Sequence, residues 1–149
     1  MAYRLNLSTP YEGMSFIWNI SAQVGDSTSC QNNPTDVHLV TMLLGAWITS
    51  VHPSIHPSCR QAFEGDGRMT INKAYWIRAA NSQHTQDLSF SEAGIISPAR
   101  PRGIYGQHAW SIVRFNYTMR SQMRTDWENL PNHRQCTPAL RAELLNNTQ

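Results

Sequence analysis

The chain has 149 residues, of which 40% are hydrophobic and only 15% are charged, and its formal net charge at pH 7 is +2. A chain of this length forms one compact domain without needing a metal or disulfides. No apolar run approaches the roughly 20 residues that cross a bilayer, so no membrane span is expected. There is no concentrated basic stripe, which argues against nucleic acid as a partner. Typical domains carry about 25% charged residues, so the low charge suits either a surface largely covered by partners or one that is uncharged and soluble.

Residues 1–32 are predicted to form an extended N-terminal arm and loop. Apolar and polar residues alternate from Met14 to Val24, which is the period of a half-buried strand. Residues 3–7 alternate as well, and Ser8-Thr9-Pro10 and Glu12-Gly13 indicate a turn between them. Either the long strand is open to pairing with another chain, or it pairs with residues 3–7 of its own chain. In the first case the interface anchors would be Met14, Phe16, Trp18 and Ile20.

A helix is predicted to begin at residue 33. Asn33 is a favourable N-cap residue, Pro34 suits the first helical position, and Asp36 places a carboxylate in the first turn. The helix should end before Pro53.

Three further helices are predicted beyond residue 66. One runs from Thr70 through Ala80, with Ile71, Ala74, Tyr75 and Arg78 along one side. Another covers about Gln107–Arg124. In the last, Thr137 is the cap and Pro138 is the first helical residue.

The expected fold class is mostly α with a minor β part. A compact domain of three to four helices, residues 33–149, follows the extended N-terminal arm, and residues from about 81 to 103 form a long loop.

Several histidines and cysteines are candidate metal ligands, because zinc binds their nitrogen and sulfur atoms. The candidates are His52, His56, Cys59, His133 and Cys136. Their spacing lacks a paired CxxC, so scattered loop histidines and buried thiols are the alternative and no metal site is assigned. No GxSxG, HExxH or CxxC motif is present. We therefore predict a protein without catalytic residues or cofactors.

The stretch from Val24 to Asn81 resembles the peptidoglycan-binding-like modules of phage and prophage proteins. The residues that carry this resemblance are Val24-Gly25, Asn33-Pro34-Thr35-Asp36-Val37 with Leu39-Val40, Leu43-Leu44, and the turn Gly65-Asp66-Gly67. Later segments are similar to small proteins of tailed-phage genomes. The chain differs from those modules after Asp66-Gly67, where Arg68-Met69 leads directly into the next helix.

The resemblance implies a non-enzymatic virion structural or accessory protein of a tailed phage, in the tail, neck, baseplate or capsid. It would be made in the host bacterial cytoplasm and would assemble through its N-terminal arm with other virion proteins and with copies of itself. One alternative is a cell-wall module that binds peptidoglycan or another glycan through Trp47, Asp66, Tyr75 and Trp76. A second alternative is a small zinc-binding protein.

Overall fold

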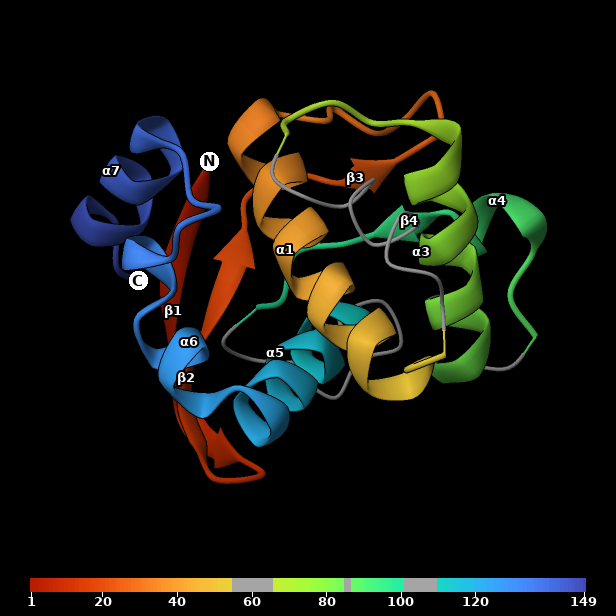
Figure 1. Ribbon diagram of the computed structural model, residues 1–149. Helices are drawn as coiled ribbons and strands as arrows, with labels where there is room; N and C mark the ends of the chain where they lie inside the picture. Colours follow the sequence, from red (N-terminus) through yellow and green to blue (C-terminus); the bar gives the residue numbers. More distant parts are fainter. Residues whose placement is uncertain (55–65, 85–86, 101–109) are drawn as a thin grey trace.

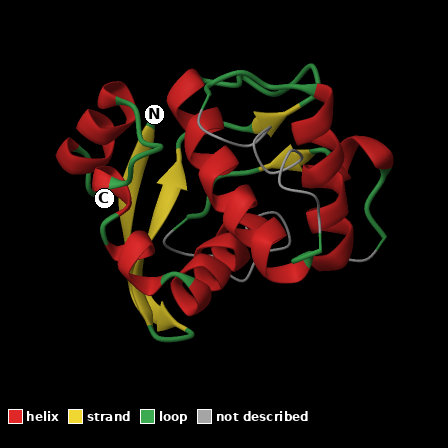
Figure 2. Cartoon of the chain, in the orientation of Figure 1, coloured by secondary structure: helices red, strands yellow, loops and turns green. Residues whose placement is uncertain are grey.

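The computed structural model describes residues 1–54, 66–84, 87–100 and 110–149. A hairpin of two N-terminal strands precedes the helices, and two short strands form a second small sheet (Figure 1). About 52% of the described structure is helical, so the predicted class, mostly α with a minor β part, is confirmed. Figure 2 shows the hairpin and the C-terminal helix at one side of the molecule, with the remaining helices beside them.

The N-terminal strands pair with each other. β1 (Ala2–Tyr11) and β2 (Met14–Ile20) are antiparallel, and Ala2 lies opposite Ile20. Of the two arrangements that the alternating pattern allows, the chain thus adopts the internal hairpin. The prediction of a strand left open for a second chain is corrected accordingly, because most of β2 already has a partner along β1.

A two-residue turn joins the two strands. Glu12 and Gly13 have φ angles of 47° and 81°. Positive φ at both central residues is what a tight hairpin turn of the I′ type requires, and its twist suits the flanking strands. The predicted turn at Glu12-Gly13 is confirmed, but Ser8-Thr9-Pro10, which were also assigned to the turn, belong to β1. Arg120 lies beneath the turn and donates from Nη1 to the carbonyl oxygen of Glu12 at 3.5 Å.

The end of the described chain covers part of the outer edge of β1. The backbone N–H of Arg4 donates to the carbonyl of Asn147 at 3.0 Å, and that of Asn6 donates to Gln149 at 2.7 Å. Gln149 returns a hydrogen bond to the carbonyl of Arg4 at 2.9 Å. These bonds form a short parallel bridge between β1 and residues 147–149. One edge of β1 is therefore bonded to β2, and part of its other edge is bonded to these C-terminal residues.

The side chain of Asn116 forms hydrogen bonds with the backbone at the outer edge of β2, at Trp18. Asn116 accepts a hydrogen bond from the Trp18 N–H at 2.9 Å and donates to the Trp18 carbonyl at 2.9 Å. It also donates to the Ile112 carbonyl at 2.8 Å and accepts from the Trp127 indole at 3.0 Å. The amide uses both donors and both lone pairs. It replaces the peptide group of a neighbouring strand.

The second sheet pairs β3 (Val24–Gly25) with β4 (Ile95–Ile96). The side chain of Asn32 accepts from the Gly25 N–H at 2.9 Å and donates to its carbonyl at 2.7 Å. A Cβ atom on Gly25 would stand 2.0 Å from the carbonyl oxygen of Gly94. The strands therefore approach so closely that only glycine fits there.

α1 (Pro34–Val51) is the central helix, and it ends before Pro53 as predicted. Pro34 is its first residue and Asp36 lies in its first turn. Asn33 precedes the helix, but it makes no side-chain hydrogen bond to the backbone there, and its amide instead lies 3.5 Å from the Asp36 carboxylate. No described helix, α1 included, is long and apolar enough to cross a membrane.

α3 (Ile71–His84) and α4 (Phe90–Ala93) follow. The predicted second helix is present and continues four residues beyond its expected end. The long loop expected at residues 81–103 is partly wrong, because it contains α4 and β4. Asn81 holds this segment in place by donating from its side chain to the Ala93 carbonyl at 2.6 Å.

The C-terminal part consists of short helices. They are α5 (Trp110–Gln122), α6 (Arg124–Glu128), the 3₁₀ helix η1 (Leu130–Asn132) and α7 (Pro138–Asn146). The predicted start of the last helix is confirmed, since the Thr137 hydroxyl accepts from the Leu140 N–H at 3.3 Å. The predicted third helix corresponds to α5, and its expected residues 107–109 lie outside the described part of the chain.

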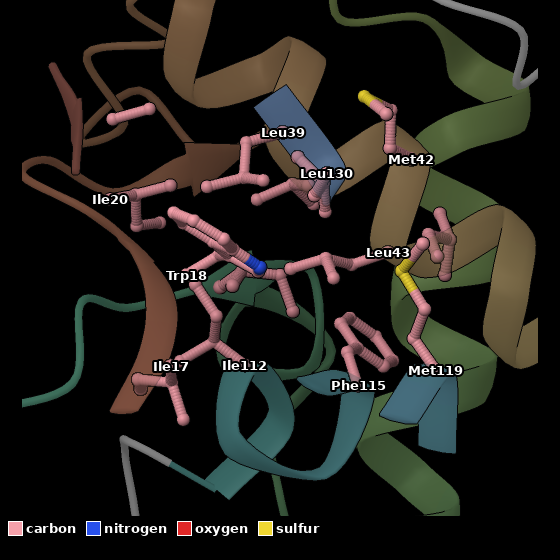
Figure 3. Packing of buried hydrophobic residues seen from close by; sticks show 14 of the residues in the cluster. Ile17, Trp18, Ile20, Leu39, Met42, Leu43, Ile112, Phe115, Met119 and Leu130 are labelled. Carbon is pink, nitrogen blue, oxygen red and sulfur yellow. The ribbon is translucent and has the colours of Figure 1, made fainter. Parts of the chain in front are cut away.

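One apolar core joins the hairpin to the helices. Figure 3 shows Trp18 of β2 in one cluster with Leu43 of α1, Ile112 and Phe115 of α5, and Leu130 of η1. All five are almost fully buried. The indole N–H of Trp18 donates to the Trp127 carbonyl at 2.7 Å, so this amphipathic ring leaves no polar atom unpaired.

Candidate functional site

The outward side of α3 is open and uncharged. Lys73, Ile77 and Ala80 of this helix point inward and are buried, whereas Ile71 is 89% exposed and Tyr75 is 64% exposed. We call the outward residues the α3 outer face; they are Ile71, Asn72, Tyr75, Ala79, Ser82 and Gln83. Exposed helix faces of soluble proteins normally carry charged side chains, so this face is unusual in having none among its members.

Arg78 lies beside the outer face, and its charge is neutralised. Its guanidinium makes two bonds to the Asp26 carboxylate, at 2.7 and 2.8 Å, and a third from Nε to the Phe90 carbonyl at 3.0 Å. The hydrogen bond from Arg78 lowers the pKa of Asp26, so the pair stays ionised at neutral pH. The Phe90 ring covers the guanidinium at 3.7 Å and is itself 76% exposed.

Ile71 and Tyr75 on α3 and Phe90 on α4 are three large apolar side chains that are exposed around the paired Arg78. Ile71 and Tyr75 are one helical turn apart, and the Phe90 ring lies on the Arg78 guanidinium. Single exposed apolar residues are ordinary on proteins, but several large ones on neighbouring elements are typical of an interaction surface. The geometry suits contact with another macromolecule.

The residues predicted to bind glycan do not form one open surface. Trp47 is 1% exposed, and its ring packs against His84 at 5.9 Å and Phe115 at 6.2 Å. Trp76 is partly buried and meets Tyr75 edge to face, with ring centroids 5.3 Å apart. Of the three predicted stacking rings, only Tyr75 is exposed.

Asp66, the fourth predicted glycan residue, stabilises a turn. Its carboxylate accepts from the Arg68 N–H at 3.0 Å and pairs with the buried ammonium of Lys73. The hydrogen bond from Lys73 lowers the pKa of Asp66. Lys73 also donates to the Arg68 carbonyl at 2.6 Å. The acidic residue thus supplies the charge that a buried lysine needs.

The predicted interface anchors of the hairpin lie mainly in the core of their own chain. Met14, Trp18 and Ile20 are buried. Phe16 is partly buried, and its ring stacks on Trp127 with centroids 4.7 Å apart. As the hairpin stands, these side chains offer a second chain little apolar surface.

The predicted metal ligands do not form a site within the described residues. Two of them lie outside that part of the chain, namely His56 and Cys59. The His52 ring contacts Trp47 at 5.4 Å, His133 accepts from the Gln135 N–H at 3.2 Å, and Cys136 is buried. Across the residues that the structure describes, no group of three or more His, Cys, Asp or Glu is placed to hold a metal ion.

His84 was not singled out by the sequence, yet it has the most perturbed environment among the described histidines. Burial lowers its pKa to about 4, and the nearby Arg114 adds to the effect. Its Nδ1 lies 3.5 Å from the Ser111 hydroxyl, but that hydroxyl donates to the side-chain oxygen of Asn81. The serine proton is therefore directed to an amide and not to the histidine, an arrangement that does not activate the hydroxyl.

A hollow of about 540 Å³ opens between α1, α5 and α6. Met42 and Met119 are buried in its wall, and Asp126, His133 and Arg134 also line it. Methionine side chains adapt to irregular neighbours, so this hollow could accept an apolar side chain. No pattern in the sequence predicted it.

The sequence grouped Ile71, Ala74, Tyr75 and Arg78 on one side of a helix but did not say which way that side points. The structure buries Ala74, exposes Ile71 and Tyr75, and leaves Arg78 partly buried beside them. Phe90, which completes the exposed surface, was missed because it lay in a segment expected to be loop. The available signal was the absence of charged residues at the six positions of the α3 outer face.

Comparison with protein-family models, with curated proteins and with solved structures finds no match for the chain. What the protein does is therefore inferred from its own residues and geometry.

Proposed function

We propose that this chain is a non-enzymatic structural or accessory component of a tailed-phage particle, in the tail, neck, baseplate or capsid. It is made in the host bacterial cytoplasm and joins the virion by contact with other virion proteins and with copies of itself. The observation that carries the proposal is the uncharged apolar surface formed by the α3 outer face together with Phe90.

This surface has the energetic properties of a protein contact. Covering Ile71, Tyr75 and Phe90 would remove large apolar side chains from water, each contributing about 1.5–3 kcal/mol. Aromatic residues often dominate the binding energy of interfaces. The charge of Arg78, which lies beside Tyr75 and Phe90, is already paired with Asp26, so covering this part of the surface does not bury an unpaired guanidinium.

The proposed assembly surface differs from the one expected from the sequence. The hairpin residues Met14, Trp18 and Ile20 belong to the core, so removing residues 1–24 would remove part of that core and is expected to unfold the protein. The contact is therefore assigned to α3 and α4, whose exposed residues can change without loss of the fold.

Two further features support the proposal. The resemblance to phage and prophage modules is carried by Asn33-Pro34-Thr35-Asp36-Val37, which form the start of α1 in the structure. In addition, burial raises the pKa of the thiols of Cys30 and Cys136. These two thiols stay protonated at neutral pH, and a protonated thiol is a poor nucleophile.

The test uses particles purified from the source host. The full-length chain is expected in the particles, and Tyr75→Asp combined with Phe90→Ser should lower its copy number at least tenfold. The matched control is Leu145→Asp, because Leu145 is also exposed and apolar, at 59%, but lies on α7. Mass spectrometry gives the copy numbers, and circular dichroism confirms that each variant is folded. Absence of the wild-type chain from particles, or equal incorporation of all variants, would overturn the proposal.

The two alternatives have less support. Glycan binding is left with Tyr75 as its open ring, since Trp47 is buried and Asp66 is paired with Lys73. Retention of the wild-type chain on purified sacculi, with loss in Tyr75→Ala, would favour that alternative. The zinc hypothesis depends on His56 and Cys59, and elemental analysis of the purified protein tests it directly.

A further inference from the structure

We infer that the partner of the α3 outer face is a second copy of this chain, bound across a two-fold axis with the two α3 helices antiparallel. This inference rests on the proposed function, because it names the partner of the same surface. It follows from the order of side chains along the helix and from the distribution of charge on it.

The side chains of the outer face are arranged by size. Its central seam runs through Ile71, Tyr75, Ala79 and Ser82, at spacings of four, four and three residues. Residues at such spacings lie along one side of a helix. The two large side chains occupy the N-terminal half of α3, and the two small ones occupy its C-terminal half.

Antiparallel pairing brings each large side chain opposite a small one. Tyr75 of one copy lies opposite Ala79 of the other, and Ile71 lies opposite Ser82. A two-fold axis makes each of these contacts twice. Packed interfaces need protrusions that fill recesses, and this seam supplies both within one helix. A parallel pair would instead place Tyr75 against Tyr75 and leave a gap at Ala79.

The charges on α3 allow this self-association. In the antiparallel pair the seam of one copy covers the seam of the other, so a free charge in the seam would lose its water without gaining a partner of opposite sign. The seam contains no charged residue. Arg78 at its side is neutralised by Asp26 at 2.7 and 2.8 Å, and Lys73 is buried on the opposite side of the helix. Antiparallel helix dipoles add a small favourable term.

The first experiment measures the mass of the full-length chain in solution by sedimentation equilibrium. A contact centred on one helix is small, so association in the micromolar range is expected. The mass should rise with concentration from the 16.9 kDa of one chain toward twice that value. Tyr75→Asp should raise the dissociation constant at least tenfold, whereas Leu145→Asp, on α7, should leave it unchanged. A wild-type chain that stays monomeric at several hundred micromolar would refute the inference.

The second experiment tests the direction of the pairing. Ile71→Cys and Ser82→Cys chains, distinguished by a mass tag, are mixed and oxidised. Antiparallel packing predicts almost only disulfides between the two variants, well above the twofold excess over either like pair that random pairing of equal amounts would give. The wild-type chain, with its three natural cysteines, sets the background. A predominance of like-with-like disulfides would contradict the antiparallel arrangement.

The two proposals fail differently. If the chain is monomeric but Tyr75→Asp still prevents incorporation into particles, the surface binds another virion protein, and only the inference of a second copy is wrong. If the chain dimerises through α3 but is absent from particles, the dimer is correct and the virion assignment is wrong.

Discussion

The hairpin and the outer side of α3 differ in how far the rest of the chain covers them. The hairpin has backbone edges and aromatic rings that could bind another chain, but its own chain takes up much of both. Asn116 bonds to the edge at Trp18, residues 147–149 bond to the edge at Arg4, and Trp18 itself is buried. On α3 the charged residues Lys73 and Arg78 are also paired, with Asp66 and Asp26. The apolar side chains of Ile71 and Tyr75, however, remain exposed to solvent. An apparent binding element can thus be internal, while an inconspicuous helix carries the open surface.

The largest expected effect tests the closed edge of β2. Asn116→Ala would leave the Trp18 N–H and carbonyl and the Trp127 indole without partners in the core. Unpaired buried groups cost about 1–3 kcal/mol each, and a small cavity adds to the loss. We expect the free energy of unfolding to fall by about 4 kcal/mol in urea denaturation. Asn129→Ala is the control, since Asn129 is exposed and its side-chain amide makes a local bond, to the Thr125 carbonyl at 3.1 Å. A loss below about 1 kcal/mol for Asn116→Ala would show that the edge does not depend on this amide.

The next effect concerns pH and the inner side of α3. His84 titrates near 6.5 in an unfolded chain and at about 4 in the folded protein. Between these values the unfolded state binds more protons, so stability is complete above pH 6.5 and is lost as pH falls toward 4. Between pH 7 and pH 5 the unfolding free energy should fall by about 2 kcal/mol.

A matched variant isolates this contribution. His84→Phe keeps an aromatic ring beside Trp47 and Phe115 but cannot be protonated, so it should remove most of the dependence on pH. A smaller slope should persist, because burial also lowers the pKa of His38. If the unfolding free energy of the variant and of the wild type depended equally on pH, the fold would not lower the pKa of His84.

The smallest expected effect compares the two sides of α3 directly. Ile71 is 89% exposed and Ile77 is fully buried in the same helix. Ile71→Ala should change the unfolding free energy of the monomer by less than about 0.5 kcal/mol, while Ile77→Ala should lower it by about 3 kcal/mol. Denaturation at low micromolar concentration, where the chain is monomeric, provides the measurement. A large loss for Ile71→Ala would mean that this face belongs to the core.

Local signals predicted much of the backbone. Pro34 and the pair Thr137-Pro138 mark helix starts that the structure confirms, because caps and first-turn residues act within a few positions of one another. Glu12-Gly13 likewise gave the hairpin turn. The alternation in residues 14–24 predicted a strand correctly over 14–20, but it left the choice of partner open, since periodicity states which side is apolar and not what covers it.

The candidate site was predicted only in part. Tyr75 was named as a possible binding residue, but for glycan and together with Trp47 and Asp66, which have structural roles. Lys73 shows why the pattern of residue types along α3 was not enough to identify its solvent-facing side. A lysine in a helix normally indicates a solvated side, yet here it is buried because Asp66 and the Arg68 carbonyl receive its protons.

The sequence by itself determined where several helices begin and where the hairpin turns. Only the tertiary structure decided that β2 pairs internally, that Asn116 replaces a strand at its edge, and that Ile71 and Tyr75 face solvent. The physical reason is the range of the interactions. Caps and turns act between neighbours in the chain, whereas Asn116 meets Trp18 across 98 positions, and such a contact exists only once the chain has folded.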